Sequence, residues 1–136
     1  MNFGAPWGGL ITSPADFARF CQMTLNLGQL DGVRLLSPAT VRAMTSNQLA
    51  GMTSVPEEDR RCRPWGLGWC LNWPGRPECF ADLLSGRAFG HWGATGTVCW
   101  LDPDSGTFML LFTTQPHEAE SRLLSRLCNV VAGAIR

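Results

Sequence analysis

Two apolar runs separated by a turn constrain the fold of this chain more than any other feature. The runs cover residues 97–101 and 107–114, and Asp, Pro, Asp, Ser and Gly fill positions 102–106 between them. Turn residues between two apolar runs predict an antiparallel hairpin. The second run is apolar at consecutive positions, which indicates that both faces of its strand are covered.

Helices are predicted before this hairpin. Ser13 and Pro14 are typical of a helix start, and Gly28 suits the position just after a helix end. Ser37 and Pro38 repeat the start signal and predict a second, short helix that ends near residue 47.

A closing helix is predicted over about residues 118–135, because one face of this segment is apolar. The apolar stripe consists of Leu123, Leu124, Leu127, Cys128, Val131 and Ile135. It most simply packs on the sheet. His117 precedes this helix and is interpreted as a surface or capping residue.

Three further segments complete the order of elements. Asp-Gly at 31–32 predicts a tight turn in a very short hairpin. Residues 50–64 lack periodicity and carry most of the local charge, so we expect a long surface loop there. Residues 65–73 are aromatic-rich and predict a strand. The whole pattern predicts a single α+β unit over residues 1–136, with an antiparallel sheet of about three strands flanked by helices.

Composition and charge exclude several kinds of function. The 11 basic residues balance 11 acidic ones, so bulk charge gives no reason to expect nucleic-acid binding. No apolar run reaches the roughly 18 residues of a membrane span, and the first residues do not resemble a signal peptide. The six cysteines form no Cys-x-x-Cys pair, which argues against a metal site and favours buried free thiols. Free thiols favour a reducing compartment such as the cytoplasm, although the sequence alone does not disclose the location. We expect no cofactor.

The segment 89–97 is the candidate functional site. It places His91 and Trp92 among glycines and other small residues, just before an apolar run. Such residues let the backbone approach a ligand closely, with the imidazole beside it. A simpler interpretation is a turn histidine stacked near Trp92. The chain has no tyrosine, and all 11 basic residues are arginine, so there is no lysine either. These features together predict half of an active site, with the other half missing.

Four segments occur in an order that carries a family resemblance. They are residues 7–20 (WGGLITSPADFARF), 30–38 (LDGVRLLSP), 65–69 (WGLGW) and 91–93 (HWG). Together they resemble the serine β-lactamase-like hydrolases, which include class C β-lactamases, DD-peptidases and esterases. In that family the third segment is similar to a Tyr-Gly-Leu-Gly-Trp strand. The fourth resembles the third active-site motif, written Lys-Thr-Gly in lactamases and often His-x-Gly in esterases.

The resemblance implies a role for each residue of this last motif. His91 would face the cleft from an edge strand as a cationic or hydrogen-bonding group. The backbone N–H of Ala94 would be the second donor of the oxyanion hole. Gly93 would let substrate lie close to the backbone. Trp92 and Gly93 would be the substrate-binding residues.

The chain departs from the family at two motifs. The family nucleophile lies in Ser-x-x-Lys, where the lysine amine activates the serine, and this chain has no lysine. The second motif usually contains Tyr-x-Asn, and there is no tyrosine. The resemblance therefore implies the C-terminal segment of a serine hydrolase, inactive alone, whose partner is the N-terminal half of the same fold. The complete enzyme would transfer the acyl group of a small ester, β-lactam or D-peptide.

Other classes of function stay open. A catalytically inactive, stand-alone binding or assembly module could use an exposed sheet edge to bind a partner strand or a second copy. A metal or redox protein would use the six cysteines. An independent Ser-His-Asp triad is disfavoured, because the chain has no Gly-x-Ser-x-Gly segment.

Overall fold

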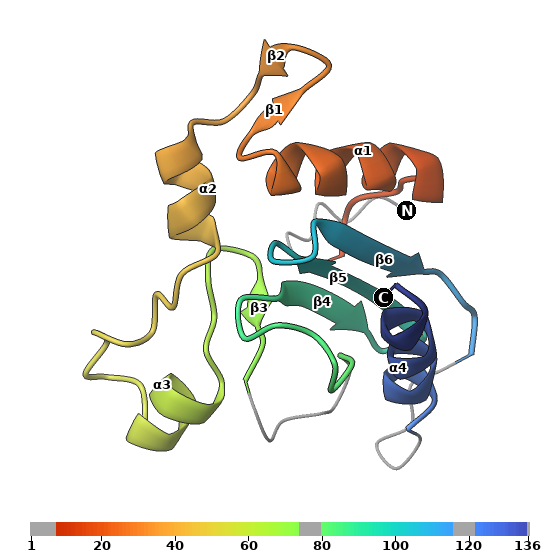
Figure 1. Ribbon diagram of the computed structural model, residues 1–136. Coiled ribbons are helices and arrows are strands. Elements are labelled where there is room, and N and C mark those ends of the chain that lie inside the picture. The colour runs from red at the N-terminus through yellow and green to blue at the C-terminus, as the bar shows by residue number, and fades with distance from the viewer. Residues whose placement is uncertain (1–7, 74–79, 116–121, 136) are drawn as a thin grey trace.

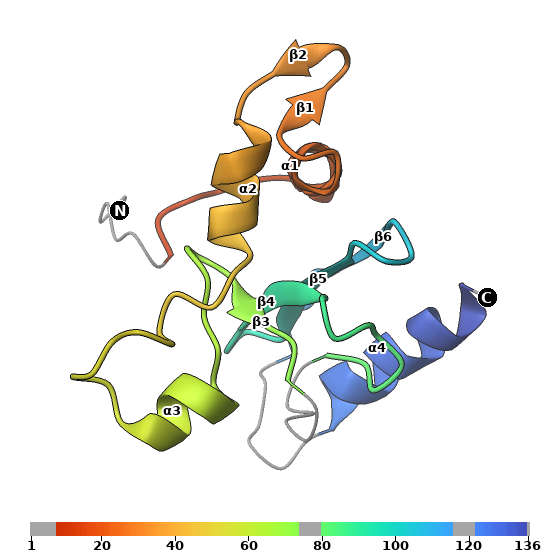
Figure 2. The ribbon, with the colours of Figure 1, turned by 60° about the vertical axis from the view of Figure 1, so that its left-hand side comes forward.

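A central antiparallel sheet between two helical layers forms the core of the molecule. The computed structural model describes residues 8–73, 80–115 and 122–135. Helix α1 (Pro14–Leu25) covers one face of the sheet and α4 (Leu123–Ala134) covers the other (Figure 1, Figure 2). The sheet has four strands in the order β3 (Cys70–Leu71), β4 (Phe89–Gly93), β5 (Thr97–Asp102) and β6 (Thr107–Leu111). The α+β class with an antiparallel sheet is confirmed.

The alternation of side chains along β4 and β5 divides the core into two clusters. Phe89 pairs with Leu101 and His91 pairs with Cys99, so these four residues share the face toward α1. The buried cluster on that face consists of Cys21, Trp69, Phe89, Cys99 and Leu101. The cluster on the α4 face consists of Phe80, Ala81, Val98, Trp100, Leu124, Cys128 and Ala132.

The predicted central hairpin is present as β5 and β6, paired from Val98 opposite Leu111 to Asp102 opposite Thr107. Strand β4 brings the sheet to four strands rather than about three. Two of its five residues are glycine, and glycine weakens a strand signal. Gly90 is nevertheless required, because a Cβ there would fall on the carbonyl oxygen of Cys99.

The aromatic segment 65–73 is a strand over two residues only, Cys70–Leu71. A tight turn precedes it, in which Trp65 forms an isolated bridge with Cys70 and the amide of Gly66 donates to Trp69 at 2.8 Å. Gly68 takes a φ of +81° in this turn. The strand prediction was therefore too long, because the glycines between the tryptophans form a turn.

The start of α1 follows the predicted capping chemistry. The Ser13 hydroxyl accepts a hydrogen bond from the Asp16 amide at 3.1 Å, and Pro14 is the first helical residue. After the helix, Gly28 adopts a φ of +91° and its amide donates to Met23 at 2.8 Å. The predicted short hairpin follows as β1 (Gln29–Leu30) and β2 (Val33–Arg34).

In the sequence, two helices lie between this hairpin and strand β3. Helix α2 (Pro38–Met44) begins at Ser37 as predicted. Helix α3 (Glu57–Cys62) lies within residues 50–64, where a loop was expected. It has no buried residue, so it lacks the apolar periodicity that would reveal it. Acidic residues fill its first turn and arginines its last, which suits the helix dipole.

Helix α4 begins at Leu123, and residues 118–121 of the predicted helix lie outside the described part of the chain. His117, Cys79 and Trp7 lie outside it as well. None of the helices in the described ranges has the length and apolar character needed to cross a membrane.

Candidate active site

The last three residues of β4 extend beyond the end of β3. Strand β3 pairs only with Phe89 and Gly90, whereas β5 pairs with β4 as far as Gly93. Within the described residues, His91, Trp92 and Gly93 therefore have a strand on one side only. The motif predicted to border a cleft therefore lies beyond the end of β3.

His91 is exposed, and its ring is held in one orientation. Its Nδ1 atom lies 2.6 Å from the carbonyl oxygen of Trp92. The Trp65 ring contacts the imidazole edge to face, with centroids 5.3 Å apart. A carbonyl oxygen can only accept a hydrogen bond, so Nδ1 carries the proton. In the neutral ring this leaves Nε2 as the proton acceptor.

Ala94 follows β4 and is exposed at the start of the turn that leads to β5. Among the described residues its amide donates no hydrogen bond. The turn itself is fixed. The Gly96 amide donates to Gly93 at 3.0 Å, and the Thr113 hydroxyl donates to the Gly96 carbonyl at 2.8 Å. Gly96 has a φ of +81°, and a Cβ there would fall on the carbonyl oxygen of Gln115.

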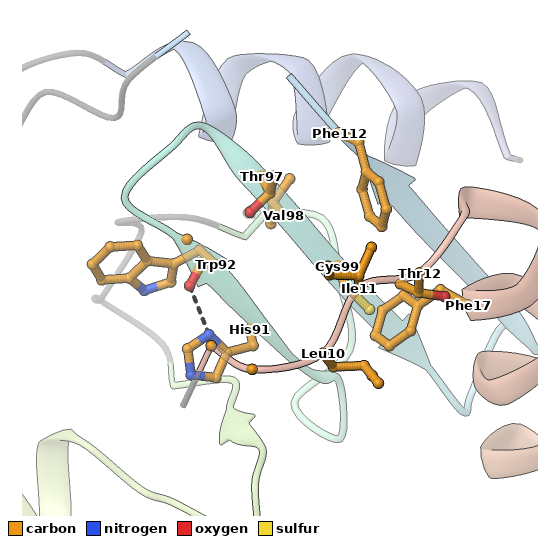
Figure 3. Close-up of a pocket in the computed structure, with 13 residues that line it drawn as sticks. Leu10, Ile11, Thr12, Phe17, His91, Trp92, Thr97, Val98, Cys99 and Phe112 are labelled. Atoms are coloured by element: carbon orange, nitrogen blue, oxygen red, sulfur yellow. Dashed lines mark hydrogen bonds between the residues drawn. The ribbon is translucent and has the colours of Figure 1, made fainter. Parts of the chain in front are cut away.

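A cavity of about 560 Å³ adjoins this edge. Residues 8–12, which lead into α1, form one wall of it, and His91, Gly93 and Cys99 of the sheet form another. Phe17 and Phe112 close it on the side of α1 (Figure 3). The lining is mostly apolar, and His91 and Cys99 are its two titratable side chains within the described residues.

The side chain of Trp92 lies on the opposite face of the sheet from that of His91. Its indole packs against the core on the α4 side, because it alternates with His91 along the strand. Its carbonyl oxygen is the atom that orients the His91 ring. The structure thus brings together His91, Gly93 and the Ala94 amide, and it places the Trp92 side chain on the opposite face.

Sequence reasoning missed two parts of this site. Cys99 lies directly opposite His91 in the register of β4 and β5, and alternation along the predicted hairpin could have placed it on the same face. The segment 8–12 carries no signal that it folds over the sheet edge. No metal site accompanies the cavity: the described ranges hold no cluster of three or more His, Cys, Asp or Glu side chains able to bind an ion.

Comparison with known families decides the class of protein. A model of the β-lactamase family matches residues 1–127. The chain belongs to the β-lactamase family. A candidate D-alanyl-D-alanine carboxypeptidase of Escherichia coli O157:H7 is 31% identical over 110 residues, which are 80% of this chain and 23% of that relative. A protein of the same description from strain K12 is 30% identical over the same share of both chains. The chain thus spans about a quarter of the length of these relatives.

Solved structures show that the fold is shared. A β-lactamase from Mycobacterium bovis superimposes with a TM-score of 0.72 at 22% identity, over 91% of this chain and 44% of that one. A penicillin-binding protein homologue from Caulobacter crescentus gives a TM-score of 0.61 at 23% identity, over 97% of this chain and 38% of that one. The family and fold implied by the sequence resemblance are therefore confirmed.

Proposed function

We propose that this chain is the C-terminal segment of a serine hydrolase that transfers acyl groups from ester or amide substrates. In the complete enzyme a serine from the remaining part of the fold attacks the substrate carbonyl. The Ala94 N–H then stabilises the oxyanion of the tetrahedral intermediate, and water releases the acyl group. The Ala94 amide donates no hydrogen bond within the described residues and directly follows Gly93, which lines the cavity with His91; this is the observation that carries the proposal.

The geometry of the turn supports this role for Ala94. An oxyanion-hole donor must be rigid and aimed at space that substrate can enter. The hydrogen bonds of Gly96 and Thr113 fix the turn, and the cavity lies beside the adjoining strand. A donor of this kind contributes on the order of 2.7–4 kcal/mol to the transition state.

His91 is suited to hold or accept a proton at the edge of the cleft. With Nδ1 bound to the Trp92 carbonyl, Nε2 is the atom able to accept a proton from the substrate or from the nucleophile. Gly93 carries no side chain, so the substrate can lie along the strand at this position.

The substrate class follows from the lining and from the relatives. The cavity is mostly apolar with few polar groups, which suits the side chain of a small acyl compound. The relatives are described as candidate carboxypeptidases for D-alanyl-D-alanine. We therefore place D-peptides first, with simple esters and β-lactams as the other substrates to compare.

The chain alone is proposed to be inactive. It has no lysine and therefore no Ser-x-x-Lys, and its partner is proposed to be the N-terminal half of the same fold. The pure 136-residue protein should hydrolyse neither a chromogenic ester nor a cephalosporin. Turnover by the pure protein that is abolished in His91→Ala would contradict the proposal.

A chimera tests the site directly. The matching 110 residues of the E. coli O157:H7 relative are replaced by this chain, and D-alanine release is measured. Ala94→Pro, which removes the N–H, should lower kcat by about 10²–10³. The neighbouring Thr95→Ala should leave kcat unchanged. Full activity of the Ala94→Pro chimera would rule out an oxyanion role for this amide.

A binding or assembly module without catalytic activity is the second candidate. Leu10 and Ile11 are 81% and 92% exposed beside the open edge of β4, and such an apolar surface suits a partner. Light scattering after size exclusion separates the two functions. A discrete, stable monomer or dimer of the chain alone supports the module, whereas poor solubility rescued by an N-terminal half supports the hydrolase segment.

A further inference from the structure

Two cysteines from separate elements meet under the cavity. Cys21 of α1 is fully buried, and Cys99 of β5 is 6% exposed. Their sulfur atoms lie 3.8 Å apart, and one thiol donates a hydrogen bond to the other. The two residues are 78 positions apart in the sequence, so only the packing of α1 on the sheet brings them together.

The pair borders the cavity on one side only. Cys99 lines the cavity beside His91, whereas Cys21 lies behind it in the core. The surrounding side chains are Trp69, Phe89 and Leu101, which offer no charged group to stabilise a sulfinate. A small oxidant that enters the cavity therefore meets one sulfur that has a second sulfur next to it.

We propose that Cys21 and Cys99 are a site of reversible oxidation, at which a disulfide joins α1 to β5 next to the candidate active site. A disulfide has a sulfur–sulfur distance of about 2.05 Å, so the two atoms must approach by about 1.8 Å. The proposal does not depend on catalysis by His91 or Ala94, and it holds for either of the two candidate functions.

A hydroperoxide supplies the oxidising equivalents. One sulfur, as the thiolate, attacks the O–O bond of hydrogen peroxide, and this forms a sulfenic acid and one water once the leaving hydroxide is protonated. The neighbouring sulfur then attacks the sulfenic sulfur and displaces a second water. Two thiols and one peroxide thus give one disulfide and two waters. A dithiol reductant reverses the bond by exchange.

The hydrogen bond between the two thiols favours the second step, in which Cys21 attacks the sulfenic sulfur of Cys99. It lowers the pKa of Cys21, although burial opposes the change. The same hydrogen bond, together with burial, raises the pKa of Cys99. Cys21 is therefore the more acidic sulfur of the pair, which suits it to resolve a sulfenic acid on Cys99, the cysteine that borders the cavity.

Other cysteines of the described chain provide the contrast. Cys62 is exposed on α3, and Cys128 is buried on the α4 side of the sheet. Neither belongs to the cluster that holds Cys21 and Cys99. An oxidation that simply followed exposure would modify Cys62 first.

Tryptic mapping of the whole chain after hydrogen peroxide treatment tests the proposal. Cleavage after arginine places Cys21 in residues 20–34 and Cys99 in residues 88–122, each without a second cysteine. We expect these two peptides to be linked, the number of free thiols to fall by two, and dithiothreitol to reverse both changes. The linked peptide should be lost when the chain is oxidised in concentrated urea, because the packing then no longer brings the sulfurs together.

Two variants serve as matched controls. Cys62→Ala should give the same linked peptide in the same yield, whereas Cys99→Ala should abolish it. The wild-type map and Cys62→Ala decide the question even if Cys99→Ala fails to fold. Oxidation of Cys62 with no link between residues 20–34 and 88–122 would overturn the proposal, as would a link from Cys99 to any other cysteine.

Discussion

The Nδ1 atom of His91 lies 2.6 Å from the carbonyl oxygen of Trp92, the next residue in β4. This contact fixes the tautomer of an imidazole that is exposed at the mouth of the cavity. It ties the imidazole to the backbone of Trp92, whose indole packs against the core on the opposite face of the sheet. The ring orientation therefore depends on packing on both faces of the sheet.

The tautomer can be measured by long-range ¹H–¹⁵N correlation of the imidazole rings. We expect the neutral His91 ring to show a protonated Nδ1 and an unprotonated Nε2, since only an N–H can donate to the Trp92 carbonyl. His117→Gln leaves a single imidazole and so assigns the spectrum. A neutral ring with its proton on Nε2 would show that the contact is absent in solution.

Gly90→Ala should destabilise the protein by about 1–3 kcal/mol, the usual range for overpacking. A Cβ at this position falls on the Cys99 carbonyl and lies 2.8 Å from the Trp100 Cα, so the β4–β5 pairing must shift. Urea unfolding measures the free energy. Gly86→Ala is the matched control, since a Cβ there meets nothing within 4 Å, and its effect should stay within about 0.5 kcal/mol. Equal effects of the two changes would contradict the close approach at Gly90.

Asp102 should make stability depend on acid pH. Its buried carboxylate is subject to desolvation, which raises the pKa, but hydrogen bonds from Ser85 and the Asp104 amide outweigh this and lower the pKa below its usual value. A carboxyl with a lowered folded-state pKa stabilises the protein above the unfolded pKa of about 3.9. This contribution is lost as the pH falls through the folded-state value.

Asp102→Asn tests this expectation. The variant should lose about 1–3 kcal/mol at pH 7, because the Ser85 donors lose their charged acceptor. Its stability should then fall less steeply than that of wild type below about pH 4. Asp31→Asn is the control, since its ion pair with Arg19 is exposed and contributes at most about 1 kcal/mol. Parallel pH profiles for wild type and Asp102→Asn would refute the role of the carboxylate.

Thiol reactivity should follow burial. Burial raises the pKa of Cys128 to about 11, whereas Cys62 is exposed. Because the thiolate is the reactive form, iodoacetamide at pH 8 should label Cys62 within minutes and Cys128 only on unfolding. Mass spectrometry of the tryptic peptide 127–136 reports Cys128 alone. Rapid labelling of Cys128 in the native chain would mean that α4 does not stay packed on the sheet.

The sequence predicted the parts of the fold that depend on neighbouring residues. Ser13 and Ser37 mark the two helix starts, and the turn at 102–106 joins β5 to β6. Each signal involves groups within a few positions of one another, so local chemistry is sufficient. Helix α3 was missed for a related reason: its six residues are stabilised by charge rather than by an apolar face.

For the candidate site, the sequence alone determined that His91 lies among glycines and other small residues, and the family resemblance added the prediction of a role for Gly93 and Ala94. Only the tertiary structure decided that β3 stops short of His91, that residues 8–12 form a wall of the cavity, and that Cys21 meets Cys99. These relationships join segments far apart in the chain. They depend on which side chains α1 and the sheet bury together, and no spacing within one segment records that choice.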